Sequence, residues 1–104
     1  MAARCAYLWE FTVRADRLEE FQREYRPQGS WVAFFRRAGG YIDSVLLRDS
    51  ANPGRFVTID RWQSAEAYRA FRAAFAEQYA ELDRRCERLT VQETALGAFE
   101  EADV

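Results

Sequence analysis

Apolar and polar residues alternate along residues 6–13, which is the pattern of a β-strand with one buried face. The apolar side of this segment consists of Tyr7, Trp9, Phe11 and Val13. The other side consists of Leu8, Glu10 and Thr12. Because successive side chains of a strand point to opposite faces of a sheet, we expect the aromatic side to face the protein core.

Three further segments are predicted to be extended. Residues 41–48 and 55–62 flank the turn-rich sequence of residues 49–54, which contains Asp, Ser, Asn, Pro and Gly and is typical of a hairpin loop. The two flanking segments should therefore pair as antiparallel strands. Residues 91–99 predict a fourth strand close to the end of the chain.

Helical periodicity separates these strands. Leu18, Phe21 and Tyr25 recur at helical spacing before Pro27, and a second short helix is predicted from Ser30 to the glycines that follow residue 38. The longest periodic stretch opens at Ser64 and predicts one main amphipathic helix. Its apolar positions are Tyr68, Phe71, Phe75, Tyr79, Leu82, Cys86 and Leu89.

The order of the elements predicts a single α+β domain over residues 1–104, of ferredoxin-like βαββαβ type. Right-handed crossovers would place the helices on one face of a four-stranded antiparallel sheet and leave the other face uncovered. Glu10 should lie on this open face, and we expect Asp60 to join it there from a neighbouring strand.

Charge and hydropathy exclude several classes of partner. The chain has 15 Lys and Arg against 17 Asp and Glu, with both signs interspersed, so a grip on a nucleic-acid backbone is not expected. No long apolar run and no apolar signal segment after Met1 is found, so we expect no membrane attachment and a cytoplasmic location.

The cysteine and histidine content limits the possible chemistry. Cys5 and Cys86 are far apart and outside any CxxC arrangement, so both are expected to be small buried or half-buried thiols, without zinc or a disulfide. The chain contains no His, which removes the commonest metal ligand and the commonest general base. We therefore expect neither a metal nor a cofactor.

Several motifs resemble the antibiotic biosynthesis monooxygenase family. They are Gly40-Tyr41-Ile42, Leu46-Leu47-Arg48-Asp49, Asn52-Pro53-Gly54-Arg55-Phe56, Asp60-Arg61-Trp62-Gln63-Ser64 and Glu66-Ala67-Tyr68. The clearest marker is the acidic residue two positions before Trp62, at a junction between a strand and a helix. The resemblance implies a dimeric α+β barrel, a homodimer in which two sheets pack face to face.

The resemblance also implies candidate site residues. In members that oxidise aromatic phenols without metal or flavin, a Trp at the end of the third strand and a Tyr six residues later line the site, as Trp62 and Tyr68 would here. Those members have an Asn four residues before the Trp, where this chain has Thr58, which offers one hydroxyl in place of an amide. Haem-degrading relatives use a His ligand, which this chain lacks.

Each candidate residue also has a structural interpretation. Trp62 could pack in the core or at a dimer contact, and Tyr68 could pack within the helical stripe. Glu10 and Asp60 could share a pocket in which one acts as a base, or they could be solvated or paired with an Arg such as Arg55 or Arg61.

The function that the resemblance implies is cofactor-independent oxidation of a small aromatic phenol or hydroquinone by molecular oxygen. Trp62, Tyr68, Asp60 and Glu10 are the candidate catalytic residues. Thr58, Phe35 and Tyr41 are candidates for binding the substrate. The alternatives are a non-catalytic dimer that binds a small hydrophobic ligand, and a cofactor-free isomerase or cyclase with a carboxylate base.

Overall fold

The structure is a computed structural model that describes residues 3–102. Its element order confirms the predicted βαββαβ arrangement, with an interruption in each helical crossover. The elements are β1 (Cys5–Val13), the short 3₁₀ helix η1 (Ala15–Arg17), α1 (Leu18–Tyr25), α2 (Ser30–Phe35), β2 (Tyr41–Arg48), β3 (Arg55–Trp62), α3 (Ala65–Ala74), α4 (Ala76–Glu87) and β4 (Thr90–Glu100).

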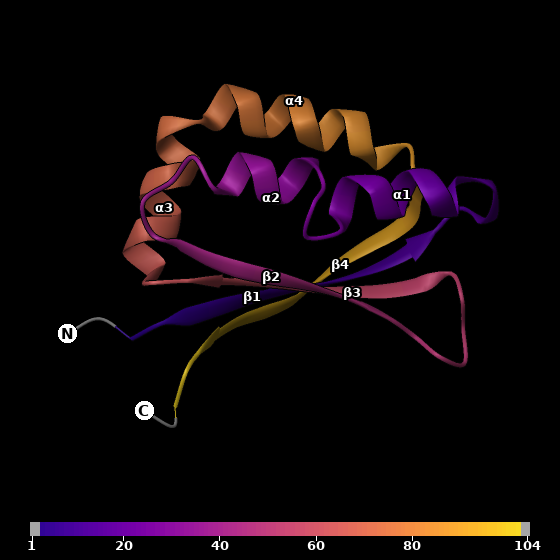
Figure 1. Cartoon of the computed structure of the whole chain (residues 1–104), viewed down its shortest axis with the longest axis horizontal. Helices are drawn as coiled ribbons and strands as arrows, with labels where there is room; N and C mark the ends of the chain where they lie inside the picture. The colour runs from indigo at the N-terminus through magenta and orange to yellow at the C-terminus, as the bar shows by residue number, and fades with distance from the viewer. Residues whose placement is uncertain (1–2, 103–104) are drawn as a thin grey trace.

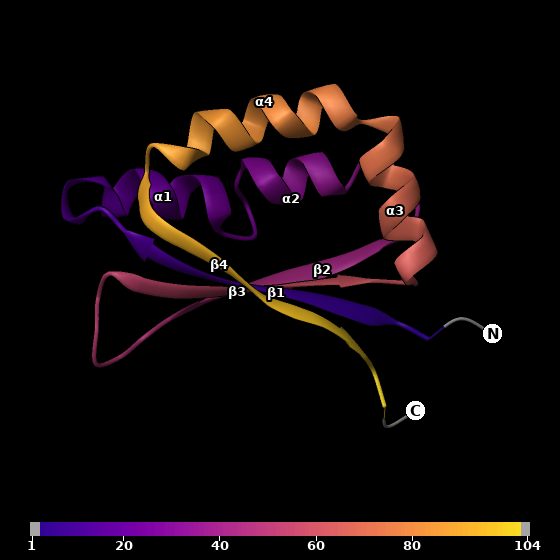
Figure 2. The same ribbon diagram turned by 180° about the vertical axis from the view of Figure 1, so that it is seen from behind.

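The four strands form one antiparallel sheet in the order β2-β3-β1-β4, and the helices lie on one face of it (Figures 1 and 2). The ferredoxin-like α+β fold expected from the sequence is therefore confirmed. The opposite face of the sheet carries no helix among the described residues, as Figure 2 also shows. Among the same residues, no helix is long and apolar enough to cross a membrane.

The main helix that was predicted as one element is in fact two. Ser64 begins it as expected, because its hydroxyl accepts a hydrogen bond from the Ala67 backbone N–H at 3.1 Å. The backbone leaves helical geometry at Phe75, whose ring packs against Phe34 and Phe71. The chain turns there, and α4 then runs along α2 (Figure 1).

Aromatic side chains fill most of the layer between the sheet and the helices. Phe11, Phe56 and Trp62 from the strands meet Phe21 and other aromatic residues from the helices. Both cysteines are buried, as expected. Burial raises the pKa of the Cys86 thiol to about 11, so this thiol stays protonated at neutral pH and packs as a small apolar group.

Candidate functional site

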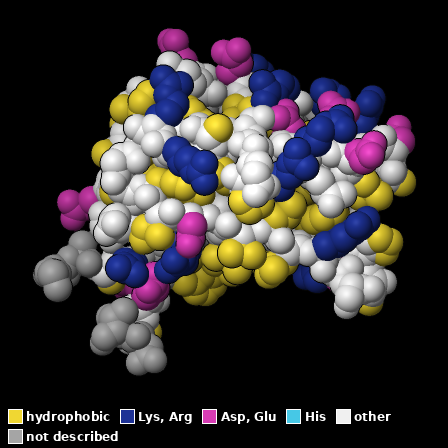
Figure 3. Space-filling model, viewed as in Figure 1, with side chains coloured by type: hydrophobic (Ala, Val, Ile, Leu, Met, Phe, Trp, Pro, Cys, Tyr) yellow, Lys and Arg dark blue, Asp and Glu magenta, His cyan; other side chains and the backbone are white. Residues whose placement is uncertain are grey.

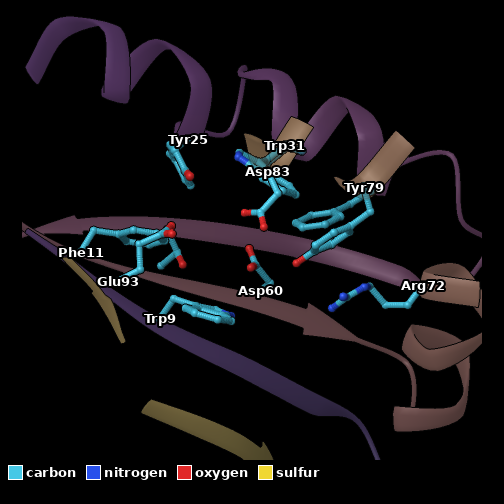
Figure 4. Close-up of a pocket in the computed structure, with 12 residues that line it drawn as sticks. Trp9, Phe11, Tyr25, Trp31, Asp60, Arg72, Tyr79, Asp83 and Glu93 are labelled. Carbon is cyan, nitrogen blue, oxygen red and sulfur yellow. The ribbon is translucent and has the colours of Figure 1, made fainter. Parts of the chain in front are cut away.

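A cavity of about 200 Å³ lies between the helix-covered face of the sheet and the helices (Figure 4). Its apolar walls are aromatic side chains and one valine: Trp9, Phe11, Tyr25, Trp31, Val32, Phe35 and Tyr79. Its polar lining consists of Thr58, Asp60, Arg72, Asp83 and Glu93. A cavity with aromatic walls and a few convergent polar groups is suited to a small planar ligand.

Asp60 lies on the floor of this cavity, near the middle of the sheet. In the strand pairing it is opposite Tyr7 of β1 on one side and Ser44 of β2 on the other. Protein surrounds the carboxylate on most sides, and this burial raises its pKa from the ordinary value of 3.8 to about 6. The carboxylate is therefore a base whose strength is close to that required near neutral pH.

Two hydroxyl groups support Asp60 from β2. The Ser44 hydroxyl donates a hydrogen bond to Asp60 Oδ1 at 2.6 Å, and the Tyr41 hydroxyl lies 2.7 Å from Ser44 Oγ. Because the single hydrogen of Ser44 goes to Asp60, Tyr41 must be the donor in its contact with Ser44. Tyr41 therefore lies behind Asp60 in a hydrogen-bond chain and is not one of the cavity-lining residues.

Thr58 and Phe35 line the cavity with Asp60, so these three candidate residues are brought together. Thr58 and Asp60 are two residues apart on β3 and share its helix-facing side. Phe35 comes from the end of α2. The helix-facing side of β3 thus presents a hydroxyl and a carboxylate to the same aromatic space.

Glu10 lies on the opposite face of the sheet from Asp60, so the expectation that the two would share a face is wrong. Glu10 pairs with Val57, whereas Asp60 pairs with Tyr7, whose side chain faces the helices. Glu10 forms an ion pair with Arg55 instead, which is one of the structural interpretations considered from the sequence. The cause is the register of β1 on β3, because a shift of one residue exchanges the two faces.

Trp62 is fully buried and is not among the residues that line the cavity. Its ring packs edge-on against Phe35 and Tyr41, so it supports two site residues from behind. Its indole N–H has no hydrogen-bond partner among residues 3–102. The position favours the packing interpretation of Trp62 over direct contact with a substrate.

Tyr68 also lies outside the cavity lining, beside it at the start of α3. Its ring stacks on Tyr7, with 4.0 Å between the ring centroids. Its hydroxyl accepts a hydrogen bond from Nη1 of Arg72 at 2.9 Å, and Arg72 does line the cavity. Tyr68 is therefore connected to the cavity through an arginine.

Sequence reasoning missed several lining residues, among them Arg72, Tyr79 and Asp83 of the long helical stretch. A signal was present, since Tyr68, Arg72, Tyr79 and Asp83 are separated by four, seven and four residues and so occupy one helical side. Glu93 was missed on β4. Burial raises its pKa, with a further contribution from the negative charges of Asp83 and Glu87.

Among the described residues, no group of three or more His, Cys, Asp or Glu side chains is arranged to hold a metal ion. Figure 4 shows Asp60 and Glu93 rising from the sheet and Asp83 descending from the helices. Of these three carboxylates, Asp60 is held by a hydrogen bond from the Ser44 hydroxyl.

A family model described as antibiotic biosynthesis monooxygenase matches residues 7–85, which span β1 through most of α4. The matched region includes most of the residues that form the cavity. No curated protein sequence matches the chain.

Solved structures of similar fold extend over nearly the whole chain. A variant of SnoaB, a cofactor-independent oxygenase from Streptomyces nogalater, is 24% identical, with a TM-score of 0.77 and coverage of 99% of this chain and 97% of that one. A Pseudomonas aeruginosa protein is 20% identical, with a TM-score of 0.75 and coverage of 98% and 97%. A conserved Methanosarcina mazei protein is 11% identical, with a TM-score of 0.77 and coverage of 96% and 94%. At these identities the likeness shows the fold.

Proposed function

Because the chain belongs to the antibiotic biosynthesis monooxygenase family, we propose that it is a cofactor-independent monooxygenase that oxidises a small aromatic phenol or hydroquinone with molecular oxygen. The observation that carries the proposal is Asp60, a carboxylate on the floor of an aromatic cavity with its pKa raised to about 6. Such a group can remove a phenol proton and can also return it. The similarity to an oxygenase structure is consistent with this chemistry.

The reaction begins when Asp60 takes the phenol proton. The electron-rich phenolate then passes one electron to O₂, and the resulting radical pair combines to form a carbon–oxygen bond at a ring carbon. The peroxide anion takes the proton back from Asp60. Loss of the ring C–H proton and cleavage of the O–O bond release water and leave a carbonyl, so one phenol and one O₂ give one quinone and one water. The substrate itself supplies the electrons.

The cavity contributes shape and hydrogen bonds to this sequence. Phe35 and Trp9 offer flat apolar walls for an aromatic ring, beside the largely buried carboxylate of Asp60. The Thr58 hydroxyl, two residues from Asp60 on the same strand, can donate a hydrogen bond to the substrate or to the peroxide oxygen.

The direct test is oxygen consumption with 1-naphthol and related electron-rich phenols, combined with ¹⁸O₂ labelling of the quinone. We expect turnover by the wild-type protein, and a decrease of about 10²- to 10⁴-fold in the Asp60→Asn variant. Asp43→Asn is a matched control, because Asp43 lies on the neighbouring strand and pairs with Arg61 outside the cavity. Absence of oxygen uptake across the phenol panel would contradict the proposal.

The same carboxylate supports one other activity. A base of this strength in an aromatic cavity can also remove an acidic C–H proton, as a cofactor-free isomerase or cyclase does. Product formation under anaerobic conditions that depends on Asp60 would indicate this alternative. Stoichiometric ligand binding with no product in either condition would indicate a non-catalytic binding protein.

We further propose a homodimer formed through the open face of the sheet. Val45 and Leu47 of β2 and Phe99 of β4 are between 43% and 51% exposed, although they are large apolar side chains. Strand pairing places Val45 next to Ile59 and Leu47 next to Val57, which makes the patch continuous across two strands. Figure 3 shows hydrophobic atoms along the edge below the sheet. Exposed apolar patches of this kind commonly mark an interface.

A further inference from the structure

Arg72 lines the cavity and forms no salt bridge with any described residue. This is unexpected, since Asp60 and Asp83 line the same space. Other arginines are paired, such as Arg61 with Asp43 and Arg85 with Glu24. Arg72 is therefore a cation that lines the cavity with no described carboxylate within salt-bridge distance, although the negative charge of Asp83 contributes to raising its pKa.

The guanidinium group is held in place by two tyrosines. Its Nη1 donates a hydrogen bond of 2.9 Å to the Tyr68 hydroxyl, and its central carbon lies 3.7 Å from the centroid of the Tyr79 ring. A guanidinium stacked on an aromatic face is oriented by the ring while its other N–H groups stay free. Figure 4 shows Arg72 extending from α3 toward the side of the cavity on which Asp60 lies.

We propose that Arg72 is a binding site for a negatively charged oxygen of the ligand, so that the cavity prefers an ionised hydroxyaromatic compound to a neutral one of the same shape. The planar fork of donors suits a phenolate or enolate oxygen, and the contact is a charge-assisted hydrogen bond. Tyr68 and Tyr79 are then positioning residues that act through Arg72.

A role of Arg72 in turnover rests on the proposed function. When Asp60 takes a proton, the ligand becomes negative, and the Arg72 guanidinium in the same cavity stabilises that charge. Tyr68, which does not line the cavity itself, would act by orienting Arg72 through their hydrogen bond. The binding preference exists whether or not oxidation follows, so it is measurable without turnover.

The test compares two naphthoquinones at pH 7.5. The hydroxyl of 2-hydroxy-1,4-naphthoquinone is ionised at this pH, whereas 1,4-naphthoquinone is neutral and similar in shape. Trp9 and Trp31 line the cavity, so quenching of tryptophan fluorescence reports binding. We expect the wild-type protein to bind the anion more tightly, and Arg72→Gln to reduce the ratio of the two affinities about tenfold.

Three further variants distinguish the effect of the position of the Arg72 guanidinium from the effect of its charge. Arg72→Lys keeps the charge without the planar fork and should lie between wild type and Arg72→Gln. Tyr68→Phe removes the hydroxyl that receives the Arg72 hydrogen bond and should lower the anion preference without changing the affinity for the neutral quinone. Arg69→Gln is the matched control, because Arg69 is exposed on the same helix, as Arg72 is, but does not line the cavity; it should leave the ratio unchanged.

An unchanged ratio in Arg72→Gln would overturn the proposal, as would equal losses in Arg69→Gln and Arg72→Gln, or failure of wild-type protein to bind the anionic quinone. An unchanged ratio in Tyr68→Phe would overturn the positioning role of that residue. Thermal melts show whether each variant is folded. If the protein consumes no oxygen but its preference for the anion still depends on Arg72, the anion site is supported and only the proposed oxidation is contradicted.

Discussion

The Ser44 hydroxyl donates a hydrogen bond to the Asp60 carboxylate from the neighbouring strand, with 2.6 Å between the oxygens. Burial raises the pKa of Asp60, whereas this hydrogen bond lowers it because it favours the charged form. The balance of the two effects is a pKa of about 6. Pairing between β2 and β3 therefore sets the strength of the candidate base, since Ser44 and Asp60 are directly opposite in the register.

The pH dependence of turnover should report the titration of Asp60. If the ionised form of Asp60 removes the phenol proton, kcat/KM should rise with pH through a midpoint near 6 and level off above it. Initial rates of oxygen uptake measured from pH 4.5 to about pH 8.5 give the profile. A flat profile across this range would show that Asp60 is not the titrating base.

Removing the hydroxyl of Ser44 should shift that profile. Without the hydrogen bond the charged carboxylate is less stable, so in Ser44→Ala the ascending limb of kcat/KM should move to higher pH. Tyr41→Phe is the matched control. It removes the donor to Ser44 and leaves the bond between Ser44 and Asp60, so its shift should be smaller. A larger shift in Tyr41→Phe than in Ser44→Ala would contradict the order of the chain.

Asp60 should also reduce the stability of the folded protein at neutral pH. Its pKa is raised in the folded state, so between about pH 4 and pH 6 the folded protein binds more protons than the unfolded chain. The free energy of unfolding should therefore fall as the pH rises through this window. Asp60→Asn, which cannot ionise, should be more stable than wild type by up to about 3 kcal/mol at pH 7.5 and show no such advantage at pH 4.

Urea unfolding at the two pH values measures this effect. Asp43→Asn is a control of opposite sign, because the Arg61 guanidinium beside Asp43 lowers the pKa of that carboxyl and stabilises its charge. Asp43→Asn should therefore be slightly less stable than wild type at pH 7.5. Equal changes in stability for the two variants would show that burial of Asp60 is not responsible.

Trp62 should matter mainly for stability. Because it is fully buried, Trp62→Ala should lower the free energy of unfolding by about 3–5 kcal/mol. Trp62→Phe should cost much less, since it keeps a ring against Phe35 and Tyr41 and removes an indole N–H that has no hydrogen-bond partner within the described part of the chain. Urea unfolding distinguishes these outcomes. A Trp62→Ala variant with wild-type stability and no turnover would instead indicate direct contact with the substrate.

A charge on the open face of the sheet should prevent the proposed dimer. Leu47 is 47% exposed beside Val57, and Leu47→Glu would place a carboxylate within the apolar patch. Light scattering at micromolar concentration should show a dimer for wild type and a monomer for Leu47→Glu. Ala80→Glu adds the same charge at an exposed position of α4, and should remain dimeric. A monomeric wild-type protein would contradict the proposal directly.

Local sequence patterns identified the strands well because a strand's alternation depends on its own side chains. The bounds expected for the hairpin, residues 41–48 and 55–62, coincide with those of β2 and β3. The face of the sheet on which Asp60 lies was less evident from the sequence. Phe56 and Trp62 lie on the same side of β3 as Asp60, and two such large aromatic side chains could have indicated that this side faces the core.

The sequence by itself determined the fold class, the order of strands and helical crossovers and the apolar side of β1, because these follow from periodicities of two and of 3.6 residues. Only the tertiary structure decided which polar side chains meet. The register of β1 on β3 separates Glu10 from Asp60, and the turn at Phe75 accompanies the placement of α4 over the cavity with Arg72 from α3. Both depend on contacts between segments far apart in the chain, which local patterns do not encode.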